Sequence, residues 1–229
     1  DKLTINSKQY TINLYTWETM ENLIYKYFNV TAEQREQIAA LYALYKEWND
    51  KINVISRKDI DLLYEHHVLH SLAILKFAEN AGIELSGCNI MDVGTGGGFP
   101  GIPLAIMLPD SRFTLVDSVG KKIKVVEEIA TSLGLKNVKA LNMRAEVVPN
   151  EFDYIVSRAV TDLQNFLPWV KGKYRRGIIY LKGGDLAFEL DNALKKNNIA
   201  ERNLFVKDIS SWFEEEFFEQ KKVIYIAKD

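Results

Sequence analysis

Five glycines stand close together between residues 92 and 101, where the sequence reads DVGTGGGFPG. A short apolar stretch at 89–93 precedes them and another at 102–108 follows, which predicts a strand, a turn and a helix in that order. Glycine permits a sharp turn and lets a ligand approach the backbone closely, and the start of the following helix offers unpaired N–H groups. This order is typical of a loop that holds a nucleotide-like cofactor.

Two known motifs fit this loop, and they imply different ligands. Its last glycines match the G-x-G-x-x-G fingerprint of dinucleotide-binding loops. Asp92 with Gly94, Gly96 and Gly98 instead resembles motif I of the class I methyltransferases, which bind S-adenosylmethionine. A dinucleotide brings a pyrophosphate to the helix N-terminus, whereas S-adenosylmethionine has no phosphate, so an acid at the strand end suits its cationic groups. A second acid, Asp117, ends the next apolar run, where a carboxylate can accept hydrogen bonds from ribose hydroxyls. We therefore expect S-adenosylmethionine as the cofactor.

The composition is that of an ordinary globular protein, with 47% hydrophobic and 26% charged residues among 229. No apolar run is long enough to span a bilayer, and the first residues show no signal-peptide pattern. Cys88 is the only cysteine, so the chain can form no internal disulfide, and we expect a cytoplasmic protein. The net charge of −2 argues against a uniformly basic nucleic-acid binder but leaves room for a local basic patch.

Apolar periodicity divides the chain into three parts. Residues 1–19 form an extension or leader with alternating apolar and polar side chains, residues 20–85 show helical spacing, and residues 86–229 alternate strand-like and helix-like runs. The strand-like runs are 89–93, 112–116, 137–141, 152–156, 177–182, 203–208 and 222–227, and the helix-like runs are 101–108, 119–133, 162–170 and 185–197. No clear helical run separates the last two strands, so they are expected to pair antiparallel.

The strand–helix alternation predicts a parallel sheet covered on both faces. The expected fold is α/β: a class I, Rossmann-like methyltransferase domain with a mostly parallel seven-stranded sheet, plus an N-terminal helical appendage.

Arg158 lies between Ser157 and Ala159, directly after the fourth strand-like run, at the sheet edge where open α/β folds bind ligands. A pyrimidine C5 methyltransferase would need a nucleophilic cysteine here, and an exocyclic-amine methyltransferase usually carries an Asn/Asp-Pro-Pro-aromatic stretch; the sequence has neither. Guanine N7 fits what remains, because its in-plane lone pair carries no proton and transfer to it needs orientation rather than a general base. Since the product is a cation, Arg158 is expected to bind guanine O6, a phosphate or the cofactor carboxylate rather than face N7. A structural ion pair is the alternative role.

Three groups of basic residues could contact an RNA backbone. They are Arg57 with Lys58, Lys121 with Lys122, and Lys173 with Arg175 and Arg176. The last group surrounds a tyrosine, and cations interleaved with aromatic residues suit RNA with stacked bases. Each group alone is more often a solvated face, so their placement on the ligand side of the sheet would strengthen the RNA interpretation.

His66 and His70 are spaced four residues apart and could hold a metal from one face of a helix. No suitable third ligand motif follows, so we expect core or surface histidines and no metal.

Four stretches are similar to one family, the GidB (RsmG) family of bacterial 16S ribosomal RNA guanine-N7 methyltransferases. They read WNDKIN at 48–53, GTGGGFPGIPL at 94–104, DSxxKK at 117–122 and FDxxxSRA at 152–159. The resemblance runs from Met20 to the C-terminus and leaves residues 1–19 outside. It implies methylation of N7 of guanine 527, in the decoding-region loop of 16S rRNA.

The resemblance also implies site residues and partners. By the family's pattern, the cofactor would contact Gly94, Phe99, Ala145, Glu146 and Arg158. The implied partner is 16S rRNA or the small ribosomal subunit and its precursors, and we expect a monomer that binds no membrane. One departure is visible, because many members have an acid where this chain has a histidine at position 70.

Two alternatives stay open. One is a cofactor-binding, RNA-binding module without catalysis, against which the intact glycine loop and the intact 157–159 stretch argue. The other is a small-molecule methyltransferase, against which the basic groups argue, since a small neutral substrate needs none of them.

Overall fold

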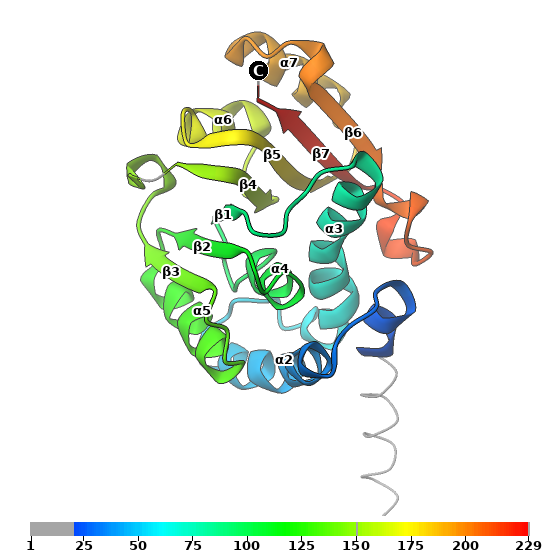
Figure 1. Ribbon diagram of the computed structural model, residues 1–229, viewed down its shortest axis with the longest axis vertical. Coiled ribbons are helices and arrows are strands. Elements are labelled where there is room, and N and C mark those ends of the chain that lie inside the picture. Colours follow the sequence, from blue (N-terminus) through cyan, green and yellow to red (C-terminus); the bar gives the residue numbers. More distant parts are fainter. Residues whose placement is uncertain (1–20, 150, 229) are drawn as a thin grey trace, which may run out of the picture.

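The computed structural model describes residues 21–149 and 151–228. In this part of the chain seven strands form one sheet in the order β3-β2-β1-β4-β5-β7-β6 (Figure 1). The strands are β1 (Asn89–Val93), β2 (Arg112–Asp117), β3 (Val138–Asn142), β4 (Phe152–Arg158), β5 (Tyr174–Gly183), β6 (Leu204–Asp208) and β7 (Lys221–Ala227). The strands β1 to β5 pair in parallel, while β7 runs antiparallel to both of its neighbours, β5 and β6. The predicted antiparallel pair and the predicted fold class are confirmed.

The strand order reverses between β1 and β4, because the chain goes from β1 outward to β2 and β3 and then returns to the other side of β1. In open α/β sheets, ligands bind at this switch point, beyond the carboxyl ends of the strands. A ligand-binding site is therefore expected among the residues that follow β1, β2, β3 and β4.

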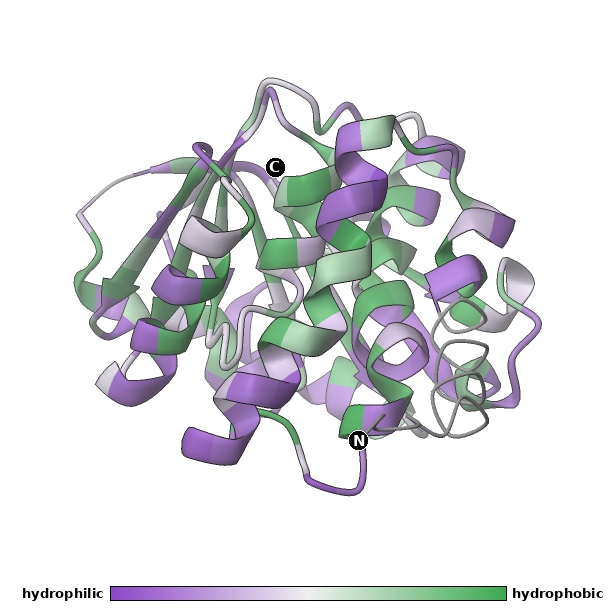
Figure 2. Ribbon diagram, turned by 90° about the horizontal axis from the view of Figure 1, so that it is seen from below, coloured by the Kyte–Doolittle hydropathy of each residue, from purple (hydrophilic) through white to green (hydrophobic). Residues whose placement is uncertain are grey.

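Helices cover both faces of the sheet. The helices α2 (Ala32–Lys51), α3 (His70–Ala81), α4 (Gly101–Met107) and α5 (Gly120–Ser132) share one apolar core with one face, and α6 (Leu163–Val170) and α7 (Ala187–Asn197) share a second core with the other. Neighbouring strand residues alternate between these cores: Ile90 belongs to the first and Met91 to the second. Apolar residues accordingly follow the inward sides of the elements, with hydrophilic ones on the outer turns (Figure 2).

The N-terminal helical layer packs directly on the sheet domain. Its residues, among them Ile24 and Tyr45, belong to the same core cluster as Leu115 of β2. The start of α2 is fixed by a capping box in which the Thr31 side chain accepts from the backbone N–H of Gln34 and the Gln34 side chain accepts from that of Thr31. This layer also contacts the glycine loop directly, because the hydroxyl of Tyr45 donates to the backbone carbonyl of Gly97 at 2.7 Å.

One segment within residues 20–85, where helical spacing was predicted, is not a regular α-helix. The chain instead makes a short 3-10 turn at Ile60–Leu62, a π-helix at Leu63–Leu69 and only then α3. π-helices are rare and frequently occur at functional sites. The expectations for residues 1–19 lie outside the described residues, and no helix within those described is long and apolar enough to cross a membrane.

Candidate cofactor and active site

The glycine loop is held in shape by Asp92, which is fully buried at the end of β1. One oxygen of its carboxyl group, Oδ2, accepts hydrogen bonds from Thr95 Oγ1 at 2.6 Å and from the backbone N–H of Gly101 at 2.9 Å. Burial raises the pKa of Asp92 to about 7. Three glycines in this loop, Gly94, Gly96 and Gly98, have positive φ angles of 67°, 58° and 103°, which L side chains adopt at a cost.

A cavity of about 490 Å³ opens beyond the carboxyl ends of β1, β2 and β4, and this volume lies within the range of about 300–1,000 Å³ that is usual for small-molecule sites. Its lining residues are Val93, Gly94, Val116, Asp117, Ser118, Lys122, Met143, Arg144, Ala145, Glu146, Arg158, Ala159, Val160 and Trp169. The cavity thus occupies the switch point of the sheet. Its lining includes the backbone of Gly94, two acidic side chains, three cationic side chains and several apolar side chains.

Gly94 lets the loop pass close to the β4 side of this cavity. A Cβ at this position would lie only 2.5 Å from Cγ2 of Val160, whereas a Cβ at Gly96 would meet nothing within 4 Å. The two glycines have similar φ angles, so they differ in surroundings rather than in backbone conformation.

Asp117 ends β2 and lines the same cavity. Its Oδ2 accepts from the backbone N–H of Gly96 at 3.0 Å and its Oδ1 from that of Val119 at 2.8 Å. The carboxylate therefore ties the glycine loop to the start of α5, and each oxygen keeps a further lone pair for a ligand hydroxyl.

Five of the residues predicted to bind the cofactor line the cavity together: Gly94, Asp117, Ala145, Glu146 and Arg158. The other four, Asp92, Gly96, Gly98 and Phe99, are not part of its lining. Of these, Asp92 accepts hydrogen bonds within the loop and so has a structural role. A Cβ at Gly98 would lie against Ile102 and the hydroxyl of Tyr45, so this position faces the helical layer.

Phe99 packs between the helical layer and β4. Its ring stacks on Tyr45 at a centroid distance of 4.8 Å, lies 5.1 Å from the ring of His67 and carries the guanidinium carbon of Arg158 at 5.2 Å. The ring of Phe99 therefore packs against the guanidinium of Arg158, at the place where the glycine loop meets the helical layer.

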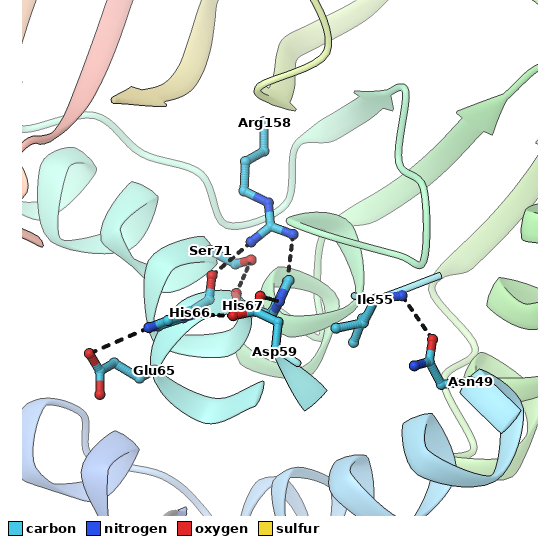
Figure 3. A network of polar contacts seen from close by, with 8 residues as sticks. All are labelled: Asn49, Ile55, Asp59, Glu65, His66, His67, Ser71 and Arg158. Carbon is cyan, nitrogen blue, oxygen red and sulfur yellow. Dashed lines mark hydrogen bonds and ion pairs between the residues drawn. The ribbon is translucent and has the colours of Figure 1, made fainter. Parts of the chain in front are cut away.

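Arg158, at the end of β4, reaches from the sheet into the helical layer (Figure 3). Its Nη1 donates to the backbone carbonyl of His66 and its Nη2 to Nδ1 of His67, both at 2.9 Å. The imidazoles of both histidines contact one carboxylate, that of Asp59: His66 Nδ1 lies 2.6 Å from Oδ1 and His67 Nε2 lies 2.5 Å from Oδ2.

The protonation of this network follows from its surroundings. Burial, with the positive charge of Arg158 added, lowers the pKa of His67 to about 4 although Asp59 opposes the shift. Burial alone would raise the pKa of Asp59, but the hydrogen bonds from His66 and His67 outweigh it and lower the value. Burial also lowers the pKa of Arg158, to about 10, which keeps the guanidinium charged at neutral pH. A charged arginine therefore faces a neutral imidazole backed by a carboxylate.

Asp59 and His67 were not among the predicted site residues. Residue 59 fell within the stretch with helical spacing, and the four-residue spacing of His66 and His70 indicated those two histidines instead. The π-helix changes that spacing, and His70 is buried against Phe217 and Phe218. The described residues contain no cluster of three His, Cys, Asp or Glu that could hold a metal.

The basic groups fall at two opposite edges of the sheet. Lys122 lines the cavity, Lys121 precedes it in the first turn of α5, and Arg57 with Lys58 precedes Asp59 on an exposed stretch. The group Lys173, Arg175 and Arg176 instead lies at the amino-terminal end of β5, away from the cavity.

Acidic and carbonyl groups neighbour that second edge. Lys173 Nζ donates to the carbonyl of Val148, and Arg175 and Arg176 lie within 4 Å of carboxylate oxygens of Asp153. The basic groups are therefore not all placed on the ligand side of the sheet, which is the arrangement that would have strengthened the RNA interpretation. The RNA role of this group stays a prediction.

Comparison with solved structures places the fold in a known class. The chain is similar to a magnesium protoporphyrin IX methyltransferase from Synechocystis PCC 6803 with bound S-adenosylmethionine, with a TM-score of 0.57 and 11% identity over 88% of this chain and 100% of that one. It is also similar to an S-adenosylmethionine-dependent methyltransferase from Aquifex aeolicus, with a TM-score of 0.53 and 18% identity over 69% of this chain and 88% of that one. The fold is therefore that of the Rossmann-like methyltransferases that use S-adenosylmethionine.

Comparison with known sequences narrows this class. The chain belongs to the rRNA small subunit methyltransferase G (GidB) family, whose model matches residues 34–215, and S-adenosylmethionine is the cofactor of this family. A ribosomal RNA small subunit methyltransferase G from Cytophaga hutchinsonii is 49% identical over 213 residues, which are 89% of this chain and 98% of the relative. One from Flavobacterium johnsoniae is 51% identical over 212 residues, 89% of this chain and 96% of the relative. The predicted family is confirmed.

Proposed function

We propose that this chain transfers a methyl group from S-adenosylmethionine to N7 of a guanine in 16S rRNA, namely guanine 527 by the family resemblance. The names of its relatives support rRNA of the small subunit as the substrate. The single observation that carries the choice of N7 is the set of groups lining the cavity, which offers orientation and charge but no cysteine nucleophile.

The cofactor fits the cavity by the chemistry of the lining. Asp117 would accept from ribose hydroxyls, Ala145 and Glu146 would lie beside the adenine, and the backbone at Gly94 would approach the amino-acid part of the cofactor. When bound there, S-adenosylmethionine would supply a methyl group attached to a positively charged sulfur. As the lone pair of the acceptor forms the new bond to the methyl carbon, the C–S bond breaks and its electron pair stays on the sulfur.

N7 of guanine needs no base for this transfer. Its lone pair lies in the ring plane and bears no proton, so correct orientation supplies the main help the protein can give. Cys88 is buried at the amino-terminal side of β1 and is not in the lining, which removes the nucleophile that ring-carbon methylation requires. Ser157 is also unsuited, because it is fully buried and its Oγ donates to the carbonyl of Val93.

Arg158 would bind a carboxylate or an oxygen atom with its remaining N–H groups. Two of its donors are used by His66 and His67, and the guanidinium has five in a fixed planar fork. A methylated guanine carries a positive charge, so contact with O6, a phosphate or the cofactor's carboxylate is compatible with the reaction, and contact with N7 is not.

RNA would approach the carboxyl-terminal edge of the sheet. Lys122 lines the cavity and Lys121 precedes it in α5. Arg57 and Lys58 are exposed and directly precede Asp59, which is linked through His67 to Arg158 of the lining. These four cations would neutralise phosphates around the target guanine.

Transfer of labelled methyl groups to purified rRNA tests the proposal. We expect incorporation into 16S rRNA, or into small subunits and their precursors, in the presence of S-adenosylmethionine and none into 23S rRNA. Cofactor binding without incorporation into any of these RNAs would indicate a binding module, and incorporation only into small molecules from a cell extract would indicate a small-molecule methyltransferase. Either result would contradict the proposed function.

A further inference from the structure

Three side chains, two from the helical layer and one from the end of β4, form one continuous chain of hydrogen bonds next to the cavity. Asp59 Oδ2 lies 2.5 Å from His67 Nε2, and His67 Nδ1 lies 2.9 Å from Arg158 Nη2. Both imidazole nitrogens of His67 are thus used, one toward an acid and the other toward a cation (Figure 3).

The direction of each hydrogen bond in this chain is fixed by chemistry. A guanidinium can only donate, so His67 must accept with an unprotonated Nδ1. The proton of a neutral imidazole then sits on Nε2 and is donated to Asp59, which as a carboxylate can only accept. Asp59 thereby selects the one tautomer of His67 that can bind Arg158.

The surrounding backbone holds the second nitrogen of the guanidinium. In a regular α-helix the N–H of His70 would bond to the carbonyl of His66, but here it bonds to the carbonyls of Glu65 and His67. The His66 carbonyl accepts from Arg158 Nη1 instead. The π-helix therefore exposes an acceptor at the point where the arginine arrives, and Phe99 supports the guanidinium from the loop side.

We propose that Asp59 and His67 are positioning residues that hold the Arg158 guanidinium at the cavity in one orientation, with Asp59 setting the tautomer of His67. The proposal rests on the proposed role of Arg158 in binding the cofactor or the guanine. It assigns to the N-terminal helical layer a part in the reaction site in addition to any RNA contact.

Two substitutions at position 67 separate positioning from packing. His67→Phe keeps a ring against Phe99 but removes both polar atoms. His67→Asn loses the ring but keeps a side-chain oxygen near the place of Nδ1, where it can accept from Arg158. We expect His67→Phe to lower methyl transfer at least tenfold and His67→Asn to retain it within about threefold.

The tautomer argument gives a further test through Asp59. An amide at this position can donate to His67 Nε2 and stabilise the other tautomer, which cannot accept from Arg158. Asp59→Asn is therefore expected to lower transfer at least tenfold in the parent chain. The same substitution is expected to have less than a threefold effect when combined with His67→Asn, since an amide side chain needs no tautomer.

Nitrogen NMR of the intact chain tests the geometry without reference to activity. In the parent chain we expect a neutral His67 protonated at Nε2 and slow rotation of the Arg158 guanidinium. His67→Phe is expected to speed this rotation, and His67→Asn to keep it slow. Tyr42→Phe, which removes a hydrogen bond to Asp61 in the same helical layer at 2.8 Å, is the control and is expected to leave both signals unchanged.

These measurements distinguish the two proposals. If the parent chain methylates no 16S rRNA, the proposed function fails, while the NMR signals still decide the geometry of the network. Protonation at Nδ1 of His67, or a guanidinium that rotates as freely in the parent as in His67→Phe, would overturn the positioning role. So would full transfer activity in a folded His67→Phe variant.

Discussion

Arg158 is the residue on which the proposed chemistry depends most. It touches the loop through Phe99, the helical layer through His66 and His67, and the cavity directly. No other cation among the described residues has all three contacts. Its planar fork of donors is what allows them to occur at once.

Lysine at this position should therefore fail although it keeps the charge. We expect Arg158→Lys to lower methyl transfer at least tenfold, which corresponds to about 1.4 kcal/mol, while the chain stays folded. Initial rates with saturating RNA, together with cofactor titration by calorimetry, would measure this. Weakened cofactor binding would assign Arg158 to the cofactor, and unchanged binding with lost transfer would assign it to the guanine.

The control is Arg112→Lys, an exposed arginine at the start of β2 and the opposite edge of the sheet. It should transfer methyl groups like the parent. Parent-like activity in Arg158→Lys itself would contradict both roles and leave a replaceable structural charge.

Asp92 gives a prediction about stability and pH. Its pKa is raised by burial from an ordinary value of 3.8 to about 7 in the folded chain. Between these two values the unfolded chain has lost the proton and the folded chain keeps it, so the contribution of this group to stability falls as pH rises through that window. Above about pH 7 the carboxyl group is ionised in the folded chain as well, and the free-energy penalty for burying its charge is complete.

The Asp92→Asn variant lacks this penalty, and its amide can still accept from Thr95 and Gly101. We expect its free energy of unfolding, relative to the parent, to rise by at least about 1 kcal/mol between pH 5 and pH 7.5. Urea unfolding of both cofactor-free chains at the two pH values would measure it. A difference that stays constant with pH would show that Asp92 titrates normally.

At the scale of elements, the glycine loop and the π-helix determine the site from opposite sides. The loop places Gly94 against Val160 and ties Gly96 to Asp117. The π-helix supplies the carbonyl and the imidazole that receive Arg158.

Two glycine substitutions in the loop should have different consequences. Gly94→Ala introduces a Cβ 2.5 Å from Val160 at the cavity wall, so we expect at least a tenfold weaker affinity for S-adenosylmethionine. Gly96→Ala places an alanine at a similar positive φ angle, 58° compared with 67° at Gly94, so the strain in the backbone is similar. The new Cβ at position 96, however, has open space around it. This substitution is expected to lower stability by about 1 kcal/mol with cofactor affinity within threefold of the parent. Calorimetric titration and thermal unfolding of both variants would test this, and equal cofactor affinities would contradict the placement of the loop.

The elements of the sheet were predictable because their signals are local. The strand β1 and the loop after it carry the motif that identifies the fold, and each predicted strand–helix unit lies within a few residues of its observed place, although β5 begins at Tyr174 rather than at residue 177. The contacts of Arg158 were not predictable. They join β4 to a segment about 90 residues earlier, and no periodicity in residues 59–70 signals a π-helix. Likewise, the packing of Phe99 against Tyr45 could not be predicted from its place in the motif, and its predicted contact with the cofactor stays a prediction.

At the scale of the whole molecule, charge is divided between two edges of the sheet. The net charge is −2, so any attraction to RNA depends on where the cations lie. Lys121 adjoins Lys122 of the cavity lining, and Arg57 with Lys58 precedes Asp59, which is linked through His67 to Arg158. At the other edge, Arg175 and Arg176 lie beside Asp153, and Lys173 donates to the carbonyl of Val148.

Two triple-alanine variants compare these edges at equal change in charge. Replacing Arg57, Lys58 and Lys121 is expected to weaken 16S RNA binding and to reduce the slope of log affinity against log salt by about 2–3. Replacing Lys173, Arg175 and Arg176 is expected to change that slope by less than about 1. Filter binding at four or more salt concentrations would measure both slopes. A larger effect of the second set would mean that RNA reaches the amino-terminal edge of the sheet.

The most direct test of the central claim is to identify the methylated atom. Purified chain, S-adenosylmethionine and unmodified small subunits would be incubated together, and the 16S rRNA would then be digested and its nucleosides and fragments mapped by mass spectrometry. We expect one new N7-methylguanine, at guanine 527, that forms at least tenfold more slowly when Arg158→Lys replaces the parent. A methyl group on another atom or another nucleotide, or none at all with the cofactor bound, would contradict it.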